Sequence, residues 1–267
     1  MKRREFIRNS CIAYPLLALP QAQALVVPEQ WPRDEMLINE QQRIIALGKE
    51  QSLYLGQFGR RVVLECRGQL KELTVGHQQP GQPDGWPNYM AATIHNEQIF
   101  ILDRAHHCID VFSSDARFTQ RITLPDTVLL PMDIGFLGNK LWLLDAAAQG
   151  VWQYQPDTGF ERFITGLSSP LAAAVSDNCL HILESGPLHI SVWDHCAHAL
   201  SHYGQGEITD GHRAMTAGNN MMVVLDRYRQ NLLMFSHGQP IHSRQLNTAS
   251  LLKHLSVTTD GTLLVTV

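Results

Sequence analysis

The sequence predicts an all-β fold, a six-bladed β-propeller, and three observations carry this prediction. Segments of fifteen residues recur along most of the chain. Each segment reads as a strand, a polar turn and a second strand. The ends of successive segments lie 39 to 46 residues apart, which is the period of a four-stranded propeller blade.

The repeated segments share one physical pattern. A short apolar run with many small residues is followed by Asn, Asp or Gly, which tolerate the left-handed backbone of tight hairpins. A β-rich run follows, and it ends in an acid in four copies. Further strands after each acid complete four antiparallel strands. Four copies align without gaps at residues 89–103, 131–145, 170–184 and 212–226, and weaker copies occupy residues 43–57 and 252–266.

The best copy shows a family resemblance. It spans residues 81–112, with Gly85-Trp86-Pro87 before the first strand and Leu102-Asp103-Arg104 at the end of the second. A third strand ending in Val111-Phe112 follows. This arrangement resembles the NHL repeat, and the resemblance extends over residues 43–267. It implies a six-bladed propeller of the NHL or TolB-like class, a fold that mostly presents a rigid face to a peptide, protein or glycan.

The last blade needs strands from elsewhere in the chain. The sequence ends after two strands of the sixth copy, and an open blade would expose the edge of a sheet. Residues 25–42 contain the apolar runs Leu25-Val26-Val27 and Met36-Leu37-Ile38. We therefore expect three regions: residues 1–24 as a signal peptide, 25–42 as the segment that closes the last blade, and 43–267 as the propeller.

The N-terminus resembles a twin-arginine export signal. Arg3 and Arg4 precede Phe6, residues 11–19 form a modest apolar stretch, and Ala22-Gln23-Ala24 is a typical cleavage site. The alternative is an ordinary secretory signal with two arginines in its basic region. Either predicts export, and the twin-arginine interpretation predicts a periplasmic protein.

Charge and hydropathy limit the partners. Cleavage after Ala24 would change the net charge from −4 to −7, and nucleic-acid binding needs concentrated positive charge. No other apolar run approaches the length of a membrane span. The expected partners are therefore a protein, peptide or glycan, with no nucleic acid and no stable membrane span in the mature protein.

The acids that end the second strands allow two interpretations. They could form an acidic ring around one mouth of the propeller, or each could cap its own turn by accepting backbone N–H bonds. Repetition in every blade favours capping, because a binding site needs different residues in different blades. These acids are Asp103, Asp145, Glu184 and Asp226.

Departures from the repeat suggest a ligand site in the central channel. Asp133 and His254 replace the alanine that three other copies carry near the axis, and Tyr89, His212 and Arg213 are expected at the mouth. These five residues are the predicted ligand-binding set. The alternative is a polar, water-filled channel without a specific ligand.

The sequence alone does not decide whether the protein binds a metal or forms a disulfide. Two histidine clusters, residues 106–108 and 195–198, contain Cys108 and Cys196. Alternation along a strand argues against His106 and His107 facing one metal, and His195 and His198 are expected among the solvated turn residues at a blade rim. The sequence requires no cofactor, although a divalent metal stays an alternative. Cys179 and Cys196 could form a disulfide or remain free thiols.

The sequence favours a binding or scaffold module over an enzyme. One version is an accessory to a periplasmic redox enzyme, since twin-arginine export often carries such proteins. The alternative is a metal-dependent propeller enzyme of lactonase or lyase type that uses the central channel. The lactonases need Glu, Asn and Asp around the axis, where this chain offers Asp133 and Asn88. The lyases need several histidines, and only His212 and His254 qualify. No catalytic residue is therefore assigned.

Export through the twin-arginine route is testable in the precursor. The double substitution Arg3→Lys and Arg4→Lys should leave the protein unprocessed in the cytoplasm, because the receptor reads the arginine pair. Cell fractionation and immunoblotting measure this. Normal processing and periplasmic recovery of the double variant would contradict the twin-arginine interpretation.

Overall fold

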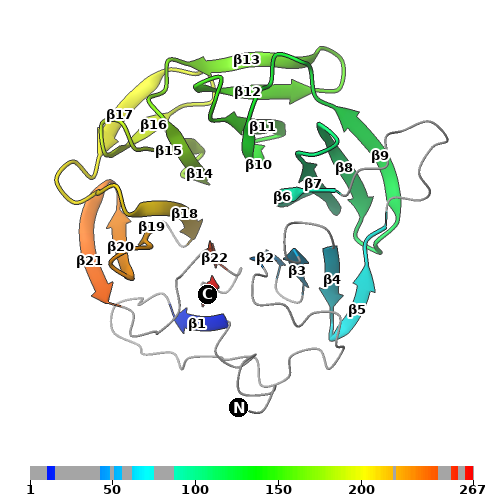
Figure 1. The fold of residues 1–267 in the computed structure, drawn as a ribbon, viewed down its shortest axis with the longest axis horizontal. Helices are drawn as coiled ribbons and strands as arrows, with labels where there is room; N and C mark the ends of the chain where they lie inside the picture. The colour runs from blue at the N-terminus through cyan, green and yellow to red at the C-terminus, as the bar shows by residue number, and fades with distance from the viewer. Residues whose placement is uncertain are drawn as a thin grey trace.

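The computed structural model describes residues 11–15, 43–48, 51–55, 62–74, 87–218, 221–245, 254–257 and 262–266. All regular secondary structure in these ranges is β-strand. The sheets are arranged radially around a central axis, as in a propeller (Figure 1). The prediction of an all-β propeller is therefore confirmed.

Five of the sheets are complete four-stranded blades in which consecutive strands pair as antiparallel neighbours. We number them blades 1 to 5 in chain order. Blade 1 contains β2 (Arg43–Gly48), β3 (Gln51–Leu55), β4 (Val62–Cys66) and β5 (Gln69–Glu72); blade 2 contains β6 (Tyr89–His95), β7 (Gln98–Asp103), β8 (Cys108–Ser113) and β9 (Phe118–Thr123); blade 3 contains β10 (Pro131–Leu137), β11 (Lys140–Asp145), β12 (Gly150–Gln155) and β13 (Gly159–Thr165); blade 4 contains β14 (Pro170–Ser176), β15 (Cys179–Glu184), β16 (His189–Trp193) and β17 (Ala199–Tyr203); blade 5 contains β18 (His212–Gly218), β19 (Met221–Asp226), β20 (Asn231–Ser236) and β21 (Gln239–Gln245).

The last sheet corrects the predicted blade count. It holds three strands in the order β1–β23–β22, so the structure has five four-stranded blades rather than six. The C-terminal part supplies β22 (His254–Val257) and β23 (Thr262–Thr266), and β1 (Cys11–Pro15) adds the third strand. The strand β22 contacts both β18 and β2, so this sheet lies between blades 5 and 1.

In the described structure, the strand β1 pairs with β23. Residues 25–42, which we expected to close the last blade, lie outside the described residues. The observed partner is Cys11–Pro15, with Cys11 opposite Thr266 and Pro15 opposite Thr262. These residues belong to the apolar stretch of the predicted signal. An apolar run satisfies the open backbone groups of a sheet edge as well as any other strand does.

The innermost strands of blades 2 to 5 share one irregularity. In each, the register shifts over the first three residues, between Tyr89 and Ala91, Pro131 and Asp133, Pro170 and Ala172, and His212 and Ala214. A bulge bends a strand and increases its twist. Its recurrence at one position shows that the blades repeat in backbone geometry as well as in sequence.

The cores lie between neighbouring blades. The interface of blades 2 and 3 contains Leu102, Ile109, Ile134 and Leu143, all nearly inaccessible to solvent. Close approach within blade 3 requires Gly135, since an added Cβ would lie 2.5 Å from the ring of Trp142. Packing between sheet faces therefore holds the ring together.

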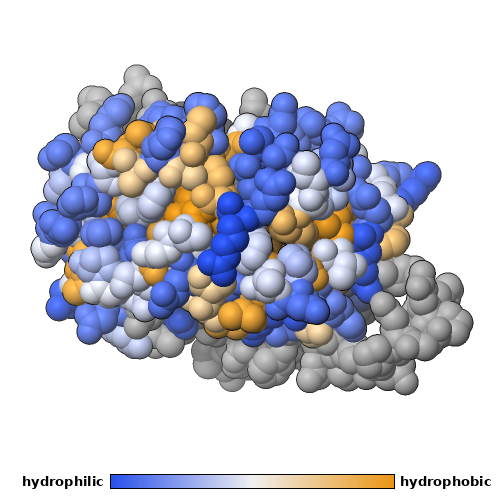
Figure 2. All heavy atoms as spheres, turned by 90° about the horizontal axis from the view of Figure 1, so that it is seen from above, coloured by the Kyte–Doolittle hydropathy of each residue, from blue (hydrophilic) through white to orange (hydrophobic). Residues whose placement is uncertain are grey.

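The outer surface is largely hydrophilic with small apolar patches, as the edge-on view in Figure 2 shows. Large apolar side chains that remain exposed are few among the described residues. Nor does any helix in those ranges have the length and apolar character that crossing a bilayer demands. The exposed apolar residues are Phe118, Leu129, Leu130, Leu200, Tyr228 and Ile241.

The pairing of β1 with β23 can be tested by cross-linking. Thr266 lies directly opposite Cys11, at a Cα separation of about 4.5–5.5 Å for antiparallel partners, which a disulfide can bridge. Thr266→Cys should therefore form a disulfide with Cys11 when the uncleaved precursor is mildly oxidised. Mass spectrometry of non-reduced peptides detects the bond.

The matched control is Val265→Cys. Val265 pairs with Ile12, one position along the strand from the pair of Cys11 and Thr266, and successive positions of a strand belong to opposite faces of the sheet. Cross-linking in neither variant would show that β1 does not occupy this edge, and equal cross-linking in both would show that its register is not fixed.

Candidate functional site

In blades 2 to 5, the acid that ends the second strand holds the loops at one end of the blade. In blade 3, the Asp145 carboxylate accepts N–H bonds from Leu129 at 2.7 Å and Leu130 at 2.9 Å, in the loop that leads into the blade. It also accepts N–H bonds from Ala147 at 3.1 Å and Ala148 at 3.0 Å, in its own turn. One buried carboxylate thus stabilises two separate loops.

The same arrangement recurs in blade 2. The Asp103 carboxylate accepts N–H bonds from Asn88, Ala105 and His106. Its second oxygen lies 2.5 Å from Nδ1 of His106. The side chain of Asp103 is fully buried, so it holds the loops and presents no free oxygen to solvent.

The corresponding acids of blades 4 and 5 also accept backbone N–H bonds. Glu184 accepts the N–H of Ser168 at 2.6 Å, and Asp226 accepts those of Tyr228 and Arg229 at 3.0 and 2.8 Å. Gly211 lies so close to Asp226 that an added Cβ would clash with the carboxylate. The capping interpretation is confirmed for Asp103, Asp145 and Asp226, which accept N–H bonds from their own turns, whereas Glu184 accepts one from the loop that leads into its blade.

We call the end of the ring that carries these four carboxylates the acid face, and the opposite end the turn face. The loops held on the acid face present exposed apolar side chains. Leu129 is 63% exposed, Leu130 is 38% exposed and Tyr228 is 72% exposed. Backbone N–H groups of all three residues donate to Asp145 or Asp226. These side chains are therefore presented by a backbone fixed in place.

Two of the predicted ligand-binding residues lie within the loop-holding structure. Tyr89 is only 8% exposed, and burial, with the nearby carboxylates of Asp110 and Asp103, raises the pKa of its phenol. His212 is 3% exposed, and its Nδ1 accepts the N–H of Thr209 at 2.9 Å. Both residues pack into the wall of the acid face instead of lining an open mouth.

The remaining predicted residues are brought together only in part. Asp133 lies on β10 and His254 on β22, innermost strands on opposite sides of the axis in Figure 1. The Asp133 carboxylate accepts the N–H of Ile134 at 3.0 Å. The side chains of Arg213 and His254 lie outside what the structure describes. A convergent site formed by all five residues therefore stays a prediction.

A buried polar cluster lies in blade 2, and its chemistry argues against a metal. Ligand atoms of Asp103, Cys108 and Asp110 lie within 4.8 Å of one another. However, Nε of Arg121 donates to Asp110 at 2.7 Å and Nη2 does so at 3.1 Å. Burial and the Asp110 charge raise the pKa of the Cys108 thiol to about 12, so the sulfur stays protonated. The guanidinium already supplies the positive charge that these carboxylates need.

The histidine clusters named from the sequence are occupied by structural bonds. Nε2 of His107 lies 3.1 Å from the carbonyl oxygen of Pro125, and Nδ1 of His198 lies 3.1 Å from Asp194. His106 bonds to Asp103 as described above. His106 and His198 thus stabilise their own turns, and His107 joins the β7–β8 turn to the loop after β9.

The cysteines are free thiols within the described residues. Cys196 is exposed in the turn that follows β16, where its N–H donates to Asp194 at 2.8 Å. Cys179 is half-buried at the start of β15. The structure therefore pairs neither residue, and of the two alternatives it shows the free thiols.

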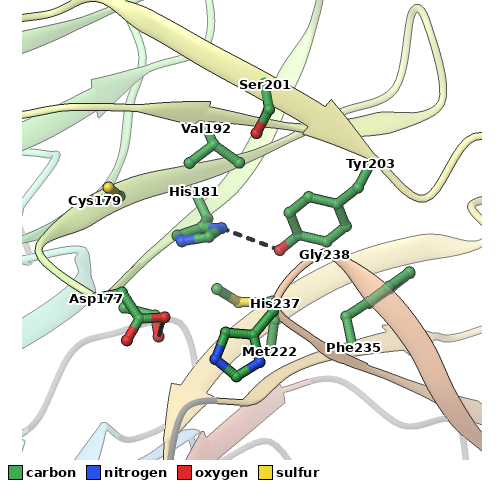
Figure 3. Close-up of a pocket in the computed structure, with 11 residues that line it drawn as sticks. Asp177, Cys179, His181, Val192, Ser201, Tyr203, Met222, Phe235, His237 and Gly238 are labelled. Carbon is green, nitrogen blue, oxygen red and sulfur yellow. Dashed lines mark hydrogen bonds between the residues drawn. The ribbon is translucent and has the colours of Figure 1, made fainter.

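The sequence analysis missed a pocket of about 190 Å³ between blades 4 and 5. His181 and Tyr203 lie in its wall, joined by a hydrogen bond of 3.1 Å between Nδ1 and the phenol oxygen (Figure 3). Asp177, Met222 and His237 also line it. The signal in the sequence was His181 itself, which replaces a large apolar residue of the repeat.

Comparisons with known proteins identify the fold. No family model and no curated protein matches the chain. Its structure is similar to virginiamycin B lyase from Staphylococcus aureus, with a TM-score of 0.62 and 16% identity over 80% of this chain and 73% of that chain. A streptogramin B lyase gives a TM-score of 0.62 and 16% identity over 83% and 77% of the two chains. YCF48 bound to a D1 peptide gives 0.58 and 9% over 84% and 76%. At such identities the likeness establishes the propeller fold alone.

The loop-holding role of Asp145 predicts a large loss of stability on substitution. Asp145→Ala leaves four N–H groups without their acceptor and should lower the free energy of unfolding by about 2–4 kcal/mol. Chemical denaturation measures this change. Asp157→Ala, at an exposed turn position of blade 3, is the matched control and should change stability by less than about 0.5 kcal/mol. Equal effects of the two substitutions would refute the assigned role.

Burial also predicts which thiols react. Cys196 is exposed and should react with a thiol reagent in the native protein, whereas Cys108 is buried with a raised pKa and should react only after unfolding. Peptide mass spectrometry after timed alkylation distinguishes the two residues. Rapid native labelling of Cys108 would show that blade 2 opens readily.

Proposed function

We propose that this protein is an exported, periplasmic β-propeller that binds a protein or peptide partner through its acid face. The observation that carries the proposal is the rigid presentation of Leu129, Leu130 and Tyr228 on that face. Side chains held in place before binding lose little conformational entropy when a partner docks. Exposed aromatic and aliphatic anchors of this kind supply most of the binding energy in protein interfaces.

Charges of both signs lie around these anchors. Arg229 lies beside Tyr228 in the turn of blade 5, and its side chain is 71% exposed. Arg104 occupies the corresponding turn of blade 2 and is half-buried. The four capping carboxylates are buried, but Asp126, Glu207 and Asp210 are exposed in the loops that lead into blades 3 and 5. A partner with an apolar anchor and polar groups of both charges fits this surface.

The comparisons support binding in general terms. YCF48, a protein of similar fold, is described in complex with a peptide, so a propeller of this architecture can accept a peptide ligand. The similar lyases show that the fold also hosts catalysis. No described cluster of this chain forms a catalytic arrangement, and we therefore favour binding. An accessory role beside a periplasmic redox enzyme is one version of this proposal.

The proposed export rests on the arginine pair and on the cleavage site after Ala24. Removal of residues 1–24 would also remove β1, which pairs with β23 in the described structure. The mature form would then need another strand at this edge. Residues 25–42, with their apolar runs, remain the segment that we propose for it.

Charge substitutions on the acid face test the binding proposal. Leu129→Asp combined with Tyr228→Asp should lower partner affinity by at least about tenfold, because two apolar anchors are lost and charged groups are placed in the apolar contact. The full-length tagged protein is cross-linked in its own cells and purified. The yield of a complex of defined stoichiometry is then compared with wild type.

The matched control is Leu200→Asp combined with Ile241→Asp. Both residues are about as exposed as the anchors, at 55% and 51%, but they lie on the outer strands β17 and β21. This variant should bind as wild type does. If the control variant loses the complex and the acid-face variant keeps it, the partner binds the rim and the proposal is wrong.

A further inference from the structure

The pocket between blades 4 and 5 opens near the turn face, away from the surface proposed for protein binding. Asp177 comes from the turn between β14 and β15, and His237 from the turn between β20 and β21. Figure 3 shows these two side chains on one side of the pocket and the bonded pair of His181 and Tyr203 on the other. Val192, Met222 and Phe235 contribute apolar surface.

The pocket exists because two apolar core positions of the repeat carry polar residues in blade 4. The position of His181 in the second strand is held by Phe100 in blade 2 and Trp142 in blade 3, which are 8% and 3% exposed. Tyr203 occupies the outer-strand position that Ile122 holds in blade 2 and Ile164 in blade 3. The register shows this, because Tyr203 lies opposite Ile190, Ile122 opposite Ile109, and Ile164 opposite Val151.

A smaller side chain on the neighbouring blade leaves further room. Between blades 2 and 3, Phe100 packs edge-on against Phe136 with ring centroids 5.0 Å apart. Blade 5 carries Ala217 at the position of Phe136. The phenyl ring that fills the earlier interface therefore has no counterpart in the later one. An unfilled space of this kind lowers stability, and its retention beside a hydrogen-bonded His–Tyr pair points to a ligand.

The size and polarity of the pocket define the ligand class. A volume of about 190 Å³ compares with an apolar cavity of ~150 Å³ that accepts benzene, so one ring with a short chain fits. The lining contains the carboxylate of Asp177 and neither lysine nor arginine. Burial lowers the pKa of His181, which favours the neutral imidazole. The fixed charge of the pocket is therefore negative, and it favours a cation.

We infer that the pocket between blades 4 and 5 binds a small single-ring aromatic amine. The ring lies on Met222 and Phe235. The bond to Tyr203 and a second bond to the backbone of Ser176 fix the imidazole of His181, which forms the polar wall beside the ring. The ammonium group lies toward the Asp177 carboxylate at the opening. This site is independent of the acid face in position and in chemistry.

Three probes that share a phenylethyl group test the inference on the full-length protein. They are 2-phenylethylamine, the neutral 2-phenylethanol and the anionic 3-phenylpropionate, each titrated while the amide resonances of the protein are followed by NMR. The amine should bind in the millimolar range or tighter. The alcohol should bind more weakly, and the anion at least about tenfold more weakly than the amine.

Two variants localise the binding. His181→Phe restores the repeat residue and fills the pocket, so it should abolish amine binding while the melting temperature stays the same or rises. Ala217 packs against the apolar cluster that contains Met222 and Phe235, so Ala217→Phe should crowd the proposed ring position from the other blade, with the same result. Asp177→Asn should keep ring binding and remove the preference for the amine over the alcohol.

The outcomes that overturn the inference are distinct. Absence of amine binding to folded wild type rejects the site. Equal binding of the amine and the anion rejects the ligand class. Undiminished amine binding to both filled variants, at unchanged stability, places the ligand elsewhere. None of these results bears on the acid face, whose test uses different residues and a different readout.

Discussion

Carboxylates buried at the ends of the second strands hold this propeller together at the places where one blade passes to the next. A sheet-on-sheet interface is stabilised by apolar contact, which has little directional preference. The loop between two blades has no such core and must satisfy its own backbone N–H groups. Asp145 and its counterparts provide the acceptors, and they connect the loop leading into a blade with the turn inside that blade. The angle and spacing of neighbouring sheets then follow from short, charge-assisted bonds.

The same bonds explain why one face of the ring can recognise a partner. A loop that is fixed by its backbone can leave apolar side chains in solvent without collapsing onto them. Leu129 and Tyr228 are exposed for this reason, whereas the histidines nearby bond inward to carboxylates or carbonyl oxygens. Structure and recognition thus use different atoms of the same residues: the N–H groups hold the loop, and the side chains face outward.

Much of the architecture could be predicted from the sequence because each residue type that recurs in the repeat favours a particular local structure. Small residues, a turn of Asn, Asp or Gly, and a terminal acid indicate a hairpin with a capped end, and the strands of blades 2 to 5 and the caps of blades 2, 3 and 5 agree with this. The strand Cys11–Pro15 could not be predicted, because an apolar run after arginines is equally typical of a signal. Burial of Tyr89 and His212 also escaped prediction, since the repeat shows where a strand begins but not which way a bulged residue faces. The pocket depends on His181 and Tyr203 together, and these residues lie on different strands whose register no single segment reveals.

The pairing of β1 with β23 has a kinetic consequence. Cys11 and Thr266 are separated by about 250 residues of chain, so this contact is among the most non-local that the protein makes. Closing a loop of that length costs about 5 kcal/mol of entropy, and non-local pairing slows folding. Blades 1 to 5 can form in order as the chain leaves the ribosome, but the last sheet must wait for β22 and β23, at residues 254–266. The ring therefore closes only after these strands are made, and until then blades 1 and 5 have one uncovered face each.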